Sequence, residues 1–137
     1  MDDRDRVMPT AEVSTERQWR ILVIDDDQYV RMLLGDLLSA WGYEADVAAD
    51  GVEGLALFGR GSYDAVLTDL AMPNVSGLDV AAGVRDRDPS VAVIVFTAFI
   101  GDLGGEELLG VRVLRKPLDI DDLRRALQES VGRSGRD

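Results

Sequence analysis

Residues 63 to 73 read Tyr-Asp-Ala-Val-Leu-Thr-Asp-Leu-Ala-Met-Pro, and this stretch decides the fold. The apolar run at 65–67 predicts a short strand that is buried on both faces. Pro73 prevents regular pairing or a helix from continuing, so the chain is expected to turn just after Asp69. Asp69 then lies at the carboxyl end of a rigid strand, exposed enough to react. Taken alone, the simpler explanation is a turn aspartate, since Asp is common where chains turn.

Other apolar runs of strand length lie on both sides of this stretch. They predict strands at 21–24, 43–48, 91–96 and 111–114. The run at 43–48 alternates more, so it is expected nearer a sheet edge, whereas 91–96 is the most apolar and is expected to be central.

Helical patterns separate these strands. The first is expected to end at Gly42 and to bury Val30, Leu33, Leu34, Leu37, Leu38 and Trp41. A short helix over 52–58 is expected to stop at Gly59 and Gly61. Ser76 is expected to cap a helix that ends at Asp88-Pro89 and buries Val80, Ala81 and Val84. Asp119 is expected to cap a last helix that buries Ile120, Leu123, Leu127 and Val131.

A strand followed by a helix, repeated along the chain, predicts an α/β fold with a parallel sheet and helices on both faces. The segment 99–110 departs from this pattern, because its internal glycines each cost a helix about 1 kcal/mol relative to alanine. We expect a fourth helix that is short or irregular, at most over 106–109. Residues 1–19 are expected to form a flexible leader, 20–132 one domain, and 133–137 a polar tail.

The composition narrows the possible functions. Asp plus Glu number 26 against 15 Lys plus Arg, a net charge of −11, which argues against binding the nucleic-acid phosphate backbone. The chain has no cysteine and no histidine, which excludes disulfides, thiolate sites, His-ligated zinc and Ser-His-Asp triads within it. No apolar run approaches membrane-spanning length, so we expect a soluble cytoplasmic protein with no direct nucleic-acid or membrane partner.

Functional side chains follow four of the predicted strands. Asp25 and Asp26 follow the first strand and Asp69 the third, while the fourth ends at Thr97 and the fifth at Lys116. In a parallel sheet these ends meet on one rim, where ligands bind. Carboxylates within 4–6 Å of one another repel by up to about 4 kcal/mol per pair. Mg²⁺ relieves that repulsion and accepts phosphate oxygens, so these groups suit phosphoryl transfer through an aspartyl phosphate.

Each of these residues also has a simpler explanation. Asp25 to Asp27 can be a helix N-cap run, Thr97 an ordinary strand residue and Lys116 a surface charge. For any one of these residues taken alone, the simpler explanation is better than a functional role. That all of the simpler explanations hold together, at matching strand ends, is much less expected.

Four segments together resemble the receiver domain of two-component response regulators. They are Ile-Leu-Val-Ile-Asp-Asp-Asp at 21–27, Leu-Thr-Asp-Leu-Ala-Met-Pro-Asn-Val-Ser-Gly-Leu at 67–78, Phe-Thr-Ala at 96–98 and Arg-Lys-Pro at 115–117. The resemblance covers about 20–131 and implies a doubly wound, flavodoxin-like sheet of five parallel strands in the order 2-1-3-4-5. It implies a stand-alone domain similar to chemotaxis response proteins.

The resemblance also implies roles for the rim residues. Asp69 would accept a phosphoryl group, Lys116 would contact it and Thr97 would move towards it. Mg²⁺ would be organised by Asp25 and Asp26, with Asp26, Asp69 and the backbone carbonyl of Ala71 as ligands. A cis bond between Lys116 and Pro117 is implied as well.

A histidine kinase or histidine phosphotransfer protein is the implied donor, and the output partner is unknown. The domain would be a monomer or a phosphorylation-dependent dimer, and it would not be an enzyme beyond its own phosphorylation and dephosphorylation. The alternatives are a phosphorelay carrier, a small Mg²⁺-dependent aspartyl-phosphate phosphohydrolase and a scaffold that has lost the chemistry. The hydrolase is disfavoured because such enzymes want a second aspartate at the position of Ala71.

Two departures from the family pattern concern output and lifetime. Val113 stands where receivers usually carry an aromatic switch residue, and the glycine-rich span from Thr97 to Lys116 is shorter than usual. We therefore expect ordering of the fourth helix to replace a rotamer switch. Ala71 and Phe99 flank the expected phosphoryl site, and neither can orient an attacking water, so slow self-hydrolysis is expected.

Overall fold

The computed structural model describes residues 18–99, 101 and 109–132. Within them the strands are β1 (Arg20–Ile24), β2 (Glu44–Ala48), β3 (Ala65–Asp69), β4 (Ala92–Thr97) and β5 (Arg112–Arg115). The helices are α2 (Gln28–Ala40), α3 (Gly51–Arg60), α4 (Gly77–Arg87) and α6 (Ile120–Gly132). The strands form one sheet in the order β2-β1-β3-β4-β5, with every pairing parallel. The predicted fold class and strand order are confirmed.

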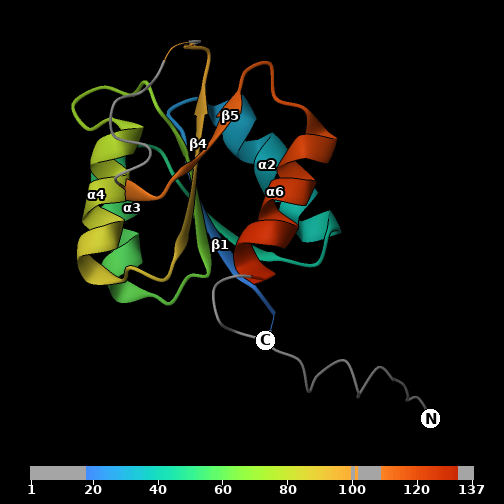
Figure 1. The fold of residues 1–137 in the computed structure, drawn as a ribbon, viewed down its shortest axis with the longest axis horizontal. Helices are drawn as coiled ribbons and strands as arrows, with labels where there is room; N and C mark the ends of the chain where they lie inside the picture. Colours follow the sequence, from blue (N-terminus) through green and yellow to red (C-terminus); the bar gives the residue numbers. More distant parts are fainter. Residues whose placement is uncertain (1–17, 100, 102–108, 133–137) are drawn as a thin grey trace.

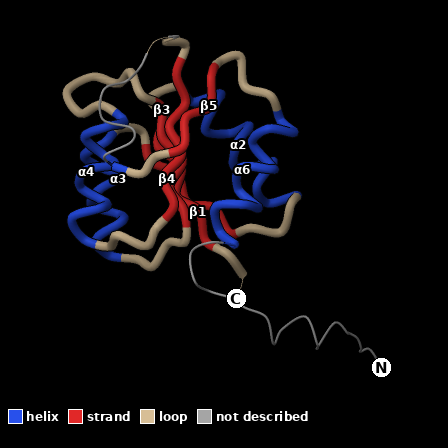
Figure 2. Tube along the Cα trace, viewed as in Figure 1, coloured by secondary structure: helices blue, strands red, loops and turns tan. Residues whose placement is uncertain are grey.

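Helices cover both faces of the sheet, α3 and α4 on one side and α2 and α6 on the other (Figure 1; Figure 2). Each side has its own apolar core, and both cores draw on the same strands because neighbouring residues point to opposite faces. The core under α2 and α6 includes Ile21, Leu34, Phe96 and Leu127. The core under α3 and α4 includes Leu22, Val66, Val80 and Val95. All of β3 is buried, as a central parallel strand requires.

Short polar side chains fix where the helices begin. Asp27 caps α2 by accepting the Tyr29 N–H, and Asp50 caps α3 by accepting the Glu53 N–H. Ser76 and Asp79 form a reciprocal capping box at the start of α4, which confirms Ser76 as the cap. Asp119 accepts the Asp122 N–H at 3.0 Å and so caps α6, also as predicted.

Some local expectations were wrong. Gly59 lies inside α3, and only Gly61, the C-cap, marks the end of that helix. Leu33 is 52% exposed and Ile120 is 47% exposed, although both were assigned to buried faces. The buried stripe of α2 is narrower than the apolar pattern, with only Leu34 and Leu38 fully covered. The expectation for 91–96 is confirmed, because β4 is a buried interior strand that pairs with β3 on one side and β5 on the other.

The expectations about the leader, the tail and the fourth helix fall largely on residues 1–17, 100, 102–108 and 133–137, which lie outside the described part of the chain. The domain boundaries proposed from the sequence therefore stay expectations.

The chain just after 102–108 is held by Arg85 of α4, whose guanidinium donates to the carbonyls of Leu109, Gly110 and Val91. Across the described ranges, none of the helices has the length and apolar character needed to cross a membrane.

The connection from β3 to α4 brings the helix start against the end of the strand. Gly77 donates its N–H to the Leu70 carbonyl at 2.8 Å. A Cβ on Gly77 would lie 2.5 Å from the Asp69 carbonyl oxygen and 2.9 Å from the Leu70 Cα. Asn74 turns the chain with a φ of 72°, a left-handed conformation that Asn tolerates. Glycine at 77 thus permits the close contact that fixes the backbone around Asp69.

We predict that Gly77→Ala destabilises the fold by about 2 kcal/mol, because the added methyl overlaps backbone atoms that cannot move aside cheaply. Urea denaturation measures the change. Gly35→Ala in α2 is the matched control, since nothing lies within 4 Å of its added Cβ. That control is expected to gain up to about 1 kcal/mol of helix stability. A Gly77→Ala protein as stable as wild type contradicts the role given to this contact.

Candidate functional site

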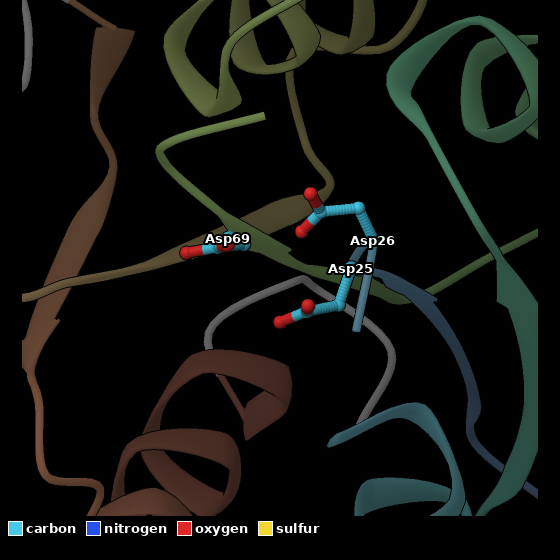
Figure 3. A group of neighbouring side chains, drawn as sticks. All are labelled: Asp25, Asp26 and Asp69. Carbon is cyan, nitrogen blue, oxygen red and sulfur yellow. The ribbon is translucent and has the colours of Figure 1, made fainter. Parts of the chain in front are cut away.

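Three carboxylates meet where β1 and β3 end. Asp25 and Asp26 directly follow β1, and Asp69 is the last residue of β3. One carboxylate oxygen from each residue lies within 4.8 Å of the others. Figure 3 shows the three side chains reaching to the same side from these two neighbouring strand ends. The parallel pairing of β1 with β3 produces this meeting, because it places both carboxyl ends at one rim.

Asp25 is the most deeply placed of the three, with 1% of its surface exposed. Its Oδ1 accepts the Asp27 N–H at 2.8 Å, whereas its Oδ2 is buried and has no hydrogen-bond partner among the described residues. Burial raises the pKa of the Asp25 carboxyl above its ordinary value of 3.8, and the Asp27 N–H opposes that rise. The charges of Asp69 and Asp26 raise this pKa further. An unsatisfied buried carboxylate oxygen is costly, so this position favours a cation.

Asp69 is nearly buried and is paired with a lysine that follows β5, two strands away in the same sheet. Lys116 Nζ lies 3.1 Å from Asp69 Oδ1, with the lysine side chain 38% exposed and the aspartate side chain 9% exposed. The pair reaches across the end of β4, which lies between β3 and β5 in the sheet. Lys116 is held in place by its N–H, which donates to the Thr97 carbonyl, and by a cis bond to Pro117 that the resemblance implied.

Thr97 ends β4 and is buried, at the same rim as Asp69. Its hydroxyl oxygen accepts the Phe99 N–H at 2.9 Å. The register pairs Asp69 with Phe96, so Thr97 lies one residue further along the rim. The O–H of Thr97 can still donate, since a hydroxyl is both donor and acceptor.

The structure places the remaining predicted residues less centrally. Ala71 is exposed in the connection between β3 and α4, two residues after Asp69. Asp27 caps α2, so the simpler explanation holds for this member of the acidic run. Sequence reasoning missed Arg31, whose guanidinium donates to the Asp25 carbonyl at 2.7 Å. Arg31 follows Asp25 by six residues across a helix cap, and no pattern in the sequence connects the two.

This arrangement has a definite chemistry. Three neighbouring carboxylates fit a hard divalent cation such as Mg²⁺, and one of them, Asp25, has a buried oxygen with no hydrogen-bond partner among the described residues. The Lys116 ammonium supplies a fixed positive charge beside Asp69. This charge can bind an anion. Together these groups suit a nucleophilic carboxylate that receives a phosphoryl group.

Comparison with known proteins agrees with this chemistry. Sporulation initiation phosphotransferase F of Bacillus subtilis (strain 168) is 31% identical over 114 residues, which cover 80% of this chain and 91% of that protein. Response regulator MprA of Mycobacterium sp. (strain KMS) is 35% identical over 123 residues, which cover 86% of this chain. The match spans only about half of that relative, 53% of its length.

A solved structure is similar over most of the chain. The response regulator protein TrrA from Thermotoga maritima, in complex with Mg²⁺-BeF, superposes with a TM-score of 0.75 and 34% identity, covering 82% of this chain and 99% of that one. The family model of the response regulator receiver domain matches residues 21–128. Such domains are the phosphoacceptor modules of two-component signalling systems. The chain belongs to the response regulator receiver domain family.

Proposed function

We propose that this chain is a response regulator that accepts a phosphoryl group on Asp69 from a histidine of a partner kinase or histidine phosphotransfer protein. The observation that carries the proposal is the meeting of Asp25, Asp26 and Asp69 at one rim, with Lys116 beside Asp69. The 137 residues contain no histidine, so the donor histidine lies outside them. The phosphorylated domain then signals through a partner-binding surface.

The transfer needs one bond to form and one to break. An oxygen of the Asp69 carboxylate bonds to phosphorus, while the bond from phosphorus to the donor imidazole nitrogen breaks and leaves its electron pair on the imidazole. The incoming phosphoryl oxygens add negative charge beside Asp69, which the Lys116 ammonium offsets from 3.1 Å away. The Thr97 hydroxyl, at the same rim, donates a hydrogen bond to a phosphoryl oxygen.

Magnesium is the cofactor that these residues fit. Asp26, Asp69 and the backbone carbonyl of Ala71 would hold it, with Asp25 organising the site through its buried, unpaired oxygen. When bound, the ion neutralises charge on the carboxylates and on the phosphoryl oxygens.

A phosphorelay carrier is a second candidate function, in which Asp69 passes the phosphoryl group on to another histidine. The similarity to a Bacillus protein named as a sporulation initiation phosphotransferase, nine-tenths of whose length is matched, favours it. A phosphohydrolase is disfavoured, because the Ala71 side chain offers no acid or base. In either candidate function the domain occupies residues 20–132, in the cytoplasm, and catalyses only its own phosphorylation and dephosphorylation.

We predict that the protein gains one phosphoryl group when incubated with Mg²⁺ and a small phosphoryl donor, and that Asp69→Asn gains none, because an amide is not a nucleophile towards phosphorus. Intact mass measures both. Asp27→Asn is the matched control: it lies in the same acidic run and keeps its cap, so it is expected to be modified like wild type. Phosphorylation of Asp69→Asn at the wild-type level would falsify the assignment of the acceptor.

We predict that Asp25→Asn stabilises the metal-free protein by about 1–2 kcal/mol at neutral pH, because it removes a buried like charge. The raised pKa means that the folded state binds the Asp25 proton more tightly than the unfolded state. Wild type therefore loses stability relative to the variant as pH rises from 3.8 through the raised pKa. Urea denaturation with a chelator, repeated across pH, measures this difference.

Added Mg²⁺ is expected to stabilise wild type more than Asp25→Asn, because the variant has less repulsion to relieve. Equal stabilisation of the two proteins by Mg²⁺, or a metal-free difference that shrinks as pH rises, contradicts the electrostatic account of Asp25.

We predict that the phosphorylated protein loses its phosphoryl group slowly. Ala71 and Phe99 bear no group that can orient a water by hydrogen bonding, and Phe99 is 53% exposed. Intact mass after removal of the donor follows the loss. A half-life of seconds in the isolated protein contradicts this prediction.

A further inference from the structure

Arg31 lies in the first turn of α2 and contacts the backbone at the carboxylate rim. Its guanidinium Nη1 donates to the Asp25 carbonyl at 2.7 Å. Over the described ranges Arg31 forms no ion pair with a carboxylate, whereas Lys116 lies 3.1 Å from Asp69. These two cations therefore act differently at the rim, because Lys116 offsets the charge of a carboxylate and Arg31 holds a peptide group.

Arg31 fixes the chain on both sides of Asp26. Its guanidinium holds the Asp25 carbonyl, and its own N–H donates to the Asp27 carbonyl at 3.0 Å. Asp25 is also held at its N–H, which donates to the Ala48 carbonyl at 3.1 Å. Asp26 lies between these anchored residues but is exposed, and its carboxylate has no hydrogen bond or ion pair with any described residue. The direction of this carboxylate therefore depends on how the backbone beside it is held.

The peptide group that Arg31 holds joins Asp25 to Asp26. Rotation of this planar group changes the backbone angles on both sides of it and so redirects the Asp26 side chain. Figure 3 shows the Asp26 carboxylate on the same side as those of Asp25 and Asp69, with one oxygen from each within 4.8 Å of the others. A shared divalent cation requires that proximity. Contacts that orient metal ligands from behind change metal affinity by roughly 10- to 100-fold.

We infer that Arg31 is a positioning residue for the magnesium site, which orients Asp26 as a metal ligand through the Asp25 carbonyl. The inference rests on the proposed function for the identity of the ion. A guanidinium near the rim repels a divalent cation, so Arg31 acting only as a charge would weaken Mg²⁺ binding. Arg31 acting on the direction of Asp26 strengthens it. The two effects have opposite signs, so removal of the side chain separates them.

Titration of the ¹⁵N-enriched full chain with Mg²⁺, in the absence of a phosphoryl donor, tests the inference through the amide signals of Asp26 and Asp69. We expect the Mg²⁺ dissociation constant of Arg31→Ala to rise about tenfold. Arg31→Lys keeps the positive charge and a donor for the Asp25 carbonyl, so it is expected to recover most of that loss. Before Mg²⁺ is added, the Asp26 amide signal of Arg31→Ala is expected to differ from wild type, because this N–H belongs to the peptide group that Arg31 holds.

Arg87→Ala is the matched control. The Arg87 guanidinium also donates to a backbone carbonyl, that of Leu55 at 2.9 Å, but Arg87 ends α4, whose other end lies beside Asp69. Arg87→Ala is therefore expected to leave the Mg²⁺ affinity unchanged. Urea denaturation of all four proteins measures their stability separately. A merely structural role of Arg31 would lower the stability of Arg31→Ala without changing the Mg²⁺ affinity of its folded form.

Four results would overturn the inference. One is unchanged or tighter Mg²⁺ binding by folded Arg31→Ala. Another is Arg31→Lys binding as weakly as Arg31→Ala, and the third is an equal loss of affinity in Arg87→Ala. The fourth, a wild type that does not bind Mg²⁺ at the rim, overturns the proposed cofactor as well. If wild type binds Mg²⁺ but Asp69 accepts no phosphoryl group, the proposed function fails alone, because the Mg²⁺ affinities of the variants still decide the role of Arg31.

Discussion

The crowding of Asp25, Asp26 and Asp69 at one rim is the constraint on which the rest of the site depends. One oxygen from each lies within 4.8 Å of the other two, and Asp25 Oδ2 is buried without a hydrogen-bond partner in the part of the chain that the structure describes. Such an arrangement opposes folding unless positive charge compensates it. Lys116 supplies part of that charge from the far side of β4. The negative charge that Lys116 leaves uncompensated favours a bound cation. A cation and Lys116 together would favour a phosphoryl group.

The sheet supplies the rigidity that makes this crowding tolerable. β3 is buried along its whole length, and Gly77 brings the start of α4 against the Asp69 carbonyl. On the other side, the Leu70 N–H donates to the Phe96 carbonyl at 2.9 Å. The backbone on both sides of the Asp69 side chain is therefore fixed before any ligand arrives, which lowers the reorganisation that the proposed phosphoryl transfer would need.

Much of the fold could be predicted because buried parallel strands require continuous apolar runs. The runs at 21–24 and 65–67 lie within strands of the structure, and the caps at Asp27, Ser76 and Asp119 follow from the hydrogen bonds that free helix N–H groups need. Burial of single helix residues was predicted less well. Leu33 and Ile120 fit the periodic pattern, but the width of the stripe that meets the sheet depends on how each helix is set against it.

The sequence by itself determined which chemical groups stand at the ends of which strands, since the order of residues along the chain fixes what comes after each apolar run. Only the tertiary structure decided how those groups meet. The 3.1 Å contact of Lys116 with Asp69, the unpaired oxygen of Asp25 and the contact of Arg31 with the Asp25 carbonyl each join residues through the strand order, the register or the angle of α2. These quantities are set by packing between distant segments, and no local pattern of residues encodes them.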